Sequence, residues 1–230
     1  MTLIILFLLE ILLILFLSKV VTNYLARFFY NLTKSYPATV NFLAIIFLPG
    51  TILHELAHLL TAGVMLVPVG ELEVIPVISE GGGVQLGSVQ IGQTDPIRRM
   101  LIGFAPIFFG VAVILGIIFL SLPALETNLV WWQLTLTIYG IFVVGNTMFS
   151  SKKDLEGVLV FVITIVVVGL LLLILNHFLK IEIWQIIVKG FSWLDLSGLP
   201  AFFKLADTYL LAPIAIDLVL VLTLKASQKG

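Results

Sequence analysis

The sequence predicts an all-α integral membrane protein of about six transmembrane helices, with a small strand-rich loop after the second helix. Its 230 residues are 60% hydrophobic and only 11% charged, and the apolar residues gather in runs long enough to cross a bilayer. Between Val69 and Pro96 these runs stop and apolar residues alternate with polar ones, which is typical of short strands.

Composition also limits the classes of function. The formal net charge is −1 and no long basic tail is present, so nothing indicates a nucleic-acid partner, and the lipid bilayer is the first partner that the sequence predicts. The chain contains no cysteine. Disulfides and thiolate ligands are therefore excluded, and a metal ion would have to be held by His, Asp or Glu.

We expect a single membrane domain over residues 1–230. It divides into a first helix and its connection (1–36), a core (38–157) that includes the strand-rich loop (69–96), and C-terminal helices (158–230). No polar stretch is long enough to fold as a separate soluble domain.

The apolar runs set the predicted helices. The first run has no basic leader and no small-residue cleavage site, so we interpret it as a retained helix and not as a signal peptide. In the third run, three glycines are expected to permit close helix contact: Gly103, Gly110 and Gly116. The predicted helices are Thr2 to Leu17 with an extension toward Arg27, Thr39 to about Gly63, Ile97–Leu122, Leu129–Phe149, Gly157–Asn176 and Leu199–Leu224, with Ile181–Leu196 lying in the membrane interface.

Three carboxylates interrupt the apolar runs. Glu10 is expected to be protonated or to face a polar partner, because an isolated charge at bilayer depth is costly. Asp207 follows Lys204 by one turn, so these two side chains are predicted to pair. Asp217 is deeper in its run and is expected to serve the packing of the bundle.

The second run carries the sequence His54-Glu55-Leu56-Ala57-His58. Three ionisable side chains within five residues cost roughly 2.5 to 3.5 kcal/mol each at bilayer depth, unless a partner compensates them. On a helix, His54 and His58 stand one turn apart on the same face, so both imidazoles can bind one divalent cation. Glu55 beside them can take a proton from water that the metal activates. We therefore predict a metal site with Glu55 as its base.

Pro49 and Gly50 precede His54 by about one turn. Proline deletes a helix hydrogen bond and glycine permits a bend. The pair is expected to open the helix locally and to admit water.

Two histidines leave a catalytic zinc one protein ligand short. The polar segment after the fourth helix offers a carboxylate that would complete the set, with one coordination position left open for water. Asp154 is the first candidate, followed by Glu156 and then by His177.

These features resemble the site-2 protease family of intramembrane zinc metalloproteases. That family pairs a membrane-embedded His-Glu-x-x-His with an Asp-Gly two helices later, preceded by an Asn. The corresponding elements here are His54 to His58 and the stretch from Asn146 to Asp154, so the resemblance covers about residues 39–157. The Asp-Gly element departs from the family, because two residues, Leu155 and Glu156, separate Asp154 from Gly157.

The resemblance implies an intramembrane zinc endopeptidase that hydrolyses a peptide bond in or near a transmembrane segment of a membrane protein. It implies Asp154 as the third ligand and Asn146 as a residue that positions the substrate strand. An exposed edge in the strand-rich loop can hold an extended peptide through backbone hydrogen bonds. Two alternatives remain open: an inactive metal-binding membrane scaffold, and a metal-ion transporter with a path along His54, His58, Asp207 and Asp217.

Positive charges divide evenly between the two sides of a six-span arrangement. One side carries the Arg98-Arg99 pair close to a helix end, and the family resemblance implies a site on the cytoplasmic side. We therefore expect a multi-pass protein of the cell membrane with both termini and the active site toward the cytoplasm.

Overall fold

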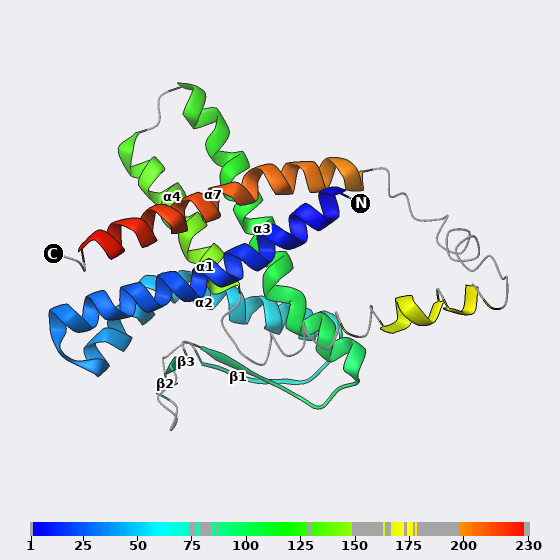
Figure 1. Ribbon diagram of the computed structural model, residues 1–230. Helices are drawn as coiled ribbons and strands as arrows, with labels where there is room; N and C mark the ends of the chain where they lie inside the picture. Colours follow the sequence, from blue (N-terminus) through cyan, green and yellow to red (C-terminus); the bar gives the residue numbers. More distant parts are fainter. Residues whose placement is uncertain are drawn as a thin grey trace.

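The computed structural model is built mainly from long apolar helices (Figure 1). It describes residues 2–73, 77–78, 84–85, 87–127, 130–148, 163, 167–172, 174–176, 178 and 198–227. The helices with defined bounds are α1 (Thr2–Thr33), α2 (Tyr36–Val64), α3 (Pro96–Thr127), α4 (Trp131–Thr147) and α7 (Leu199–Ser227). The predicted first, second, third, fourth and sixth helices are therefore present. Half of the predicted fifth helix (157–176) and all of residues 181–196 lie outside the described residues, and the described half of that helix is helical.

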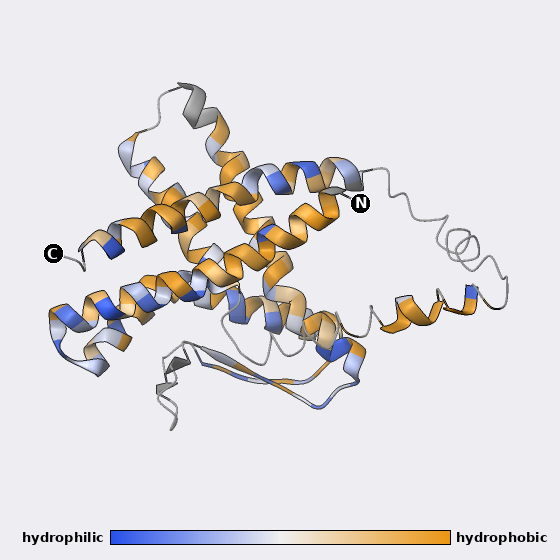
Figure 2. Ribbon diagram, in the orientation of Figure 1, coloured by the Kyte–Doolittle hydropathy of each residue, from blue (hydrophilic) through white to orange (hydrophobic). Residues whose placement is uncertain are grey.

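Four of these helices are long and apolar enough to cross a membrane: α1, α2, α3 and α7. Figure 2 shows them coloured mostly as hydrophobic. Helix α4, with 17 residues, is shorter than the roughly 20 residues that a perpendicular span needs. Its first residues, Trp131 and Trp132, are exposed, as expected for side chains at a membrane interface. These lengths and compositions are those of a multi-pass membrane protein.

The direction of α7 differs from the prediction. Phe7 of α1 contacts Phe203 near the start of α7, with ring centroids 5.3 Å apart. Leu25, near the end of α1, shares a core cluster with Leu224 near the end of α7. The two helices therefore run side by side in the same direction (Figure 1). Six alternating spans would place the first and the last in opposite directions. Within the described residues, four helices are long enough to span a membrane, and the predicted count of six is not confirmed.

The shared direction also separates the two ends of the chain, and the side of the membrane on which each lies stays a prediction. The first residues of α1 and of α7 lie at one end of the pair, and the last residues of both helices lie at the other end (Figure 1). Thr2 and Ser227 are therefore at opposite ends. Hydrophobicity could not reveal this, because a helix has the same composition in either direction.

The predicted strand-rich loop is confirmed. Strands β1 (Val69–Glu73) and β4 (Ser88–Ile91) pair antiparallel, and β2 (Val77–Ile78) and β3 (Val84–Gln85) continue as a second antiparallel pair. Figure 2 shows β1 and β4 with more hydrophilic residues than the helices, which fits a position at the membrane surface. Strand β2, which follows Pro76, was not predicted.

The buried core lies where α1 meets the other helices. One cluster joins α1, α3, α4 and α7 around Ile14, Ile114 and Leu210, and a second joins α1, α2, α4 and α7 around Val21, Phe47 and Val143. Of the glycines predicted to permit close contact in α3, only Gly110 does so, because a Cβ there would strike the Met148 side chain. Gly103 and Gly116 have no neighbour within 4 Å of a built Cβ among the described residues, so the predicted close contact is not seen for them there.

Candidate metal centre

His54 and His58 lie on one face of α2, as their spacing predicts. Their rings are nearly perpendicular, at 82°, and their Nε2 atoms are 3.2 Å apart. Both side chains are almost completely buried, with His54 3% exposed, His58 4% exposed and the intervening Glu55 4% exposed. Two imidazole nitrogens are thus directed at each other inside a helix bundle.

This distance matches that of two ligands of one zinc ion. Nitrogens bound at 2.0–2.1 Å around a tetrahedral zinc stand about 3.3–3.4 Å apart, close to the 3.2 Å between the two Nε2 atoms. The spacing of the two Nε2 atoms therefore suits two ligands of one zinc ion.

The other ring nitrogen of His58 has a partner that orients it. Nδ1 of His58 is 2.8 Å from the carbonyl oxygen of Ile102 on α3. A carbonyl oxygen only accepts hydrogen bonds, so Nδ1 carries the proton. In a neutral imidazole the lone pair is then on Nε2, which faces His54. Metal-binding histidines commonly have such a partner, because it fixes the ring and the tautomer.

Glu55 faces the strand-rich loop. A Cβ built on Gly87, which directly precedes β4, would lie 3.1 Å from both Cγ and Oε1 of Glu55 and 2.8 Å from Cγ2 of Thr51. The backbone at Gly87 thus packs against the predicted base, and the absence of a side chain permits the approach. Thr51 is 2% exposed, and its hydroxyl has no hydrogen-bond partner within the described residues.

A small cavity lies beside His54. Its volume is about 10 Å³, roughly the room that one water molecule requires. Three helices line it: α2 with Gly50, Leu53 and His54, α3 with Pro106 and Gly110, and α4 with Val144, Thr147 and Met148. The site therefore has a water-sized space next to one of its two imidazoles.

Gly50 serves the contact between α2 and α4. A Cβ there would lie 2.6 Å from Cγ1 and 2.8 Å from the carbonyl oxygen of Val143, and would also strike the Thr147 hydroxyl. Helix α2 continues through Pro49 without a break. The predicted bend at this pair stays a prediction, and Gly50 has a further role in close packing, which brings the end of α4 to the cavity.

The third ligand is not settled by the described residues. Asp154, Glu156 and His177 all lie outside them. Within the described part of the chain, no three His, Cys, Asp or Glu side chains gather in a group that could hold a metal. The two aspartates of the transporter alternative, Asp207 and Asp217, accordingly do not join His54 and His58 in such a group.

Asn146 points away from the cavity. Its Nδ2 donates hydrogen bonds to Oδ1 of Asp217 on α7, at 2.8 Å, and to the carbonyl oxygen of Phe142, at 2.9 Å. Its neighbour Thr147 lines the cavity instead. Thr147, Thr51 and Gly87 were not singled out from the sequence. The sequence offered only the positions of the two threonines as a signal: Thr51 lies one turn before Glu55, and Thr147 directly follows Asn146.

Two further carboxylates are buried between α1 and α7. Glu10 and Asp207 are each 6% exposed and lie one turn beyond the contacting rings of Phe7 and Phe203. Neither oxygen of Asp207 has a hydrogen-bond partner within the described residues, and Lys204 is exposed. The predicted pairing of Lys204 with Asp207 is therefore not formed.

No protein-family model, curated protein or solved structure matches the chain.

Proposed function

We propose that the protein is an intramembrane zinc metalloendopeptidase that hydrolyses a peptide bond in or near a transmembrane segment of a membrane protein. The observation that carries the proposal is the His54–His58 pair, with Nε2 atoms 3.2 Å apart and His58 oriented by the Ile102 carbonyl oxygen. A water-sized cavity lies beside it. Buried imidazoles in this arrangement have a clear chemical use as metal ligands.

In this proposal His54, His58 and Asp154 hold Zn²⁺, with Glu156 as the alternative third ligand. When bound, the zinc would supply Lewis-acid activation of a water molecule. Glu55 is the general base that takes a proton from the attacking water and passes it to the leaving amine. Its burial, with the Gly87 backbone packed against it, keeps bulk water from competing for that proton.

The substrate must present an extended segment. Helical substrates hide their carbonyl groups in intrahelical hydrogen bonds, so the scissile segment has to unwind before it is attacked. The strands β1 and β4 form a two-stranded sheet, in which each strand has one unpaired edge. We propose that such an edge holds the unwound peptide by backbone hydrogen bonds, with Gly87 bringing the sheet against Glu55. We further place the site toward the cytoplasmic face of the cell membrane.

Metal analysis of the detergent-purified protein tests the metal site. Wild type should contain near-stoichiometric zinc, and His58→Ala should lose it. Asp154→Ala and Glu156→Ala should be prepared in parallel. We expect only one of them to lose zinc, and that one identifies the third ligand. A wild-type protein that holds no zinc and takes up none when it is added would end the enzyme proposal.

Proteolysis tests the reaction itself. The protein would be co-expressed with a panel of single-span membrane proteins carrying a tag at each end, and the tags would report cleavage. Glu55→Gln keeps the shape of the side chain but cannot accept a proton, so we expect it to retain zinc and to lose cleavage. Cleavage by Glu55→Gln at the wild-type rate would exclude the proposed mechanism.

A further inference from the structure

A polar network joins three helices at the end of α4. Ser18 of α1 donates its hydroxyl proton to the backbone carbonyl oxygen of Asn146, at 3.0 Å. The Asn146 side chain in turn donates to Oδ1 of Asp217 on α7, at 2.8 Å. All three residues are buried, with Asn146 7% exposed and Asp217 0% exposed. Buried polar groups are costly in an apolar bundle, so each of these hydrogen bonds stabilises the contact of α4 with its neighbours. Oδ1 of Asn146 and Oδ2 of Asp217 have no hydrogen-bond partner within the described residues.

The network supplies a hydrogen-bond partner at the end of α4, where the backbone carbonyl groups have none within the helix. Asn146 is the residue before the last of α4, and the last four carbonyl groups of a helix have no partner within it. Ser18 supplies one such partner. Close packing supports the contact with α7, because a Cβ on Gly145 would lie 3.1 Å from Cβ of Pro213. The final turn of α4 is thus fixed from two sides.

The same turn forms a wall of the candidate site. Val144, Thr147 and Met148 line the cavity beside His54, on the other face of the turn from Asn146. The chain then leads within a few residues to Asp154. A displacement of this turn would change both the cavity and the point from which the proposed third ligand starts.

We propose that Asp217 is a positioning residue of the metal centre, which acts by holding Asn146 and thereby the last turn of α4. It does not touch the metal or the substrate. The expected effect of Asp217 on catalysis rests on the proposed function. Its effect on the last turn of α4 does not depend on that function. Hydrogen bonds to groups behind a metal site typically change metal affinity or activity by about 10- to 100-fold when they are removed.

Asp207→Leu provides a matched control for Asp217→Leu. Both substitutions remove a buried carboxylate from α7 and replace it with an apolar side chain of similar size, but Asp207 makes no hydrogen bond to α4. Asp217→Asn is the conservative variant, because its amide oxygen can still accept a hydrogen bond from Asn146.

Hydrogen exchange tests the structural part without metal or substrate. Amides of residues 143–148 should exchange faster in Asp217→Leu than in Asp207→Leu or in wild type, and Asp217→Asn should stay near wild type. Equal exchange in the two leucine variants would overturn the inference. If Asp217→Leu does not accumulate, the double variant Asn146→Asp with Asp217→Asn replaces it, because it exchanges the two partners of the hydrogen bond. Wild-type protection of residues 143–148 in this variant would support the inference, and loss of that protection would overturn the inference.

Cobalt tests the effect on the metal centre. The visible spectrum of Co²⁺-loaded protein reports the ligand set and geometry, which a change in overall stability alone does not alter. We expect a shifted spectrum and a kcat lowered about 10- to 100-fold in Asp217→Leu, with KM nearly unchanged, and neither effect in Asp207→Leu. A wild type that binds no Co²⁺ would remove the proposed function and leave the exchange result standing. If wild type binds Co²⁺ and cleaves the substrate, and Asp217→Leu has the same spectrum and kcat as wild type, only this inference is overturned.

Discussion

The backbone of Gly87 lies directly against the side chain of Glu55. A Cβ on Gly87 would stand 3.1 Å from Oε1 of Glu55, closer than a carbon and an oxygen pack without strain. The strand-rich loop therefore packs directly on the predicted base, although Gly87 precedes β4 and Glu55 belongs to α2.

Gly87→Ala should impair catalysis without removing the metal. The added methyl group would have to displace Thr51 or Glu55 by a few tenths of an ångström. Because an error of about 1 Å in the position of a reacting group can cost about 10²-fold, we expect kcat to fall roughly tenfold. Cleavage assays with zinc analysis of the same preparations measure both effects. Gly103→Ala, whose Cβ would have no described residue within 4 Å, is the control. A wild-type kcat for Gly87→Ala would contradict the assigned contact.

Gly50→Ala should loosen the contact between α2 and α4. The new Cβ would lie 2.8 Å from the Val143 carbonyl oxygen, a backbone atom that cannot turn aside as a side chain does. Overpacking of this kind costs typically about 1–3 kcal/mol, so thermal unfolding in detergent should occur at a lower temperature. Gly63→Ala, on the same helix and with open space around its Cβ, should be neutral or stabilising. Equal effects of the two substitutions would show that Gly50 is not at a close contact.

Local spacing was sufficient to predict the pair of histidines. Residues four apart on a helix share a face whatever the rest of the fold does, and His54 and His58 do so. The strand-rich loop was also predictable, because alternation and glycines mark strands and turns locally.

Contacts between distant segments had no local signal. The carbonyl oxygen that orients His58 belongs to Ile102, 44 residues away, and every helical residue has such a group. The Asn146–Asp217 hydrogen bond joins residues 71 apart. The sequence indicated that Asn146 and Asp217 were polar residues in or next to apolar runs. It did not indicate that they were partners or that Thr147 faces the cavity.

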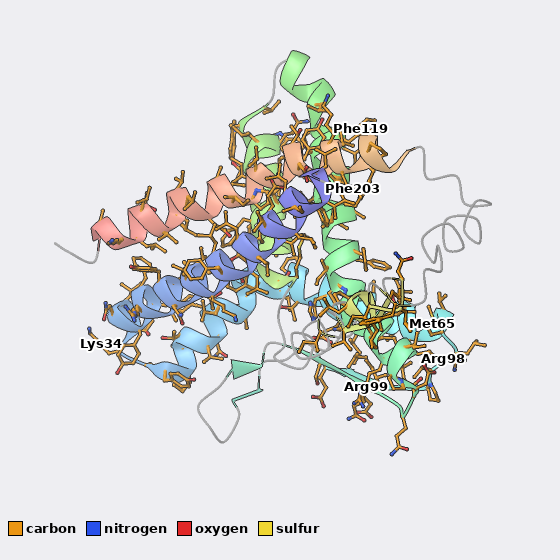
Figure 3. The ribbon with its side chains drawn as sticks, turned by 45° about the vertical axis from the view of Figure 1, so that its right-hand side comes forward. Lys34, Met65, Arg98, Arg99, Phe119 and Phe203 are labelled. Atoms are coloured by element: carbon orange, nitrogen blue, oxygen red, sulfur yellow. The ribbon has the colours of Figure 1, made fainter. Side chains whose placement is uncertain are left out.

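The direction of α7 can be checked with introduced cysteines, since the chain has none of its own. Lys34 follows the end of α1, and Arg99 lies in the first turn of α3, at opposite ends of α2. Figure 3 shows the two labelled residues far apart. In intact cells, only one of Lys34→Cys and Arg99→Cys should react with a membrane-impermeant thiol reagent, and the other should react only after the membrane is permeabilised. A cysteine at Lys225, near the end of α7, should label like Lys34→Cys, and labelling like Arg99→Cys would contradict the parallel arrangement of α1 and α7.

The start of α3 should become less stable in acid. Oδ1 of Asp95 accepts hydrogen bonds from the backbone amides of Ile97, at 3.1 Å, and Arg98, at 3.0 Å, as an N-cap does. The Arg98 amide is the main cause that lowers the pKa of this carboxyl, and the Arg98 charge adds to it.

Because the pKa of Asp95 is lower in the folded protein, the cap contributes stability above the ordinary aspartate pKa of about 4. That contribution is lost as the pH falls through the lowered folded value. Asp95→Ala should lower the thermal midpoint at neutral pH and should reduce its decline in acid. Asp95→Asn keeps the cap without a titrating group, so its midpoint should stay near that of wild type at neutral pH and decline less in acid. Identical acid profiles for wild type and Asp95→Asn would contradict this assignment.

Thr51→Val separates function from stability at the site. The Thr51 hydroxyl is buried one turn before Glu55 and has no hydrogen-bond partner within the described residues. A buried polar group left without a partner costs about 1–3 kcal/mol, so its replacement by a methyl group of equal size should leave the thermal midpoint unchanged or raise it. If the hydroxyl instead contacts the water or the peptide beside Glu55, Thr51→Val should lower kcat/KM while the zinc content stays constant. A more stable variant with lower activity would show that the protein keeps this hydroxyl for its reaction, whereas a variant with unchanged kcat/KM would remove Thr51 from the site.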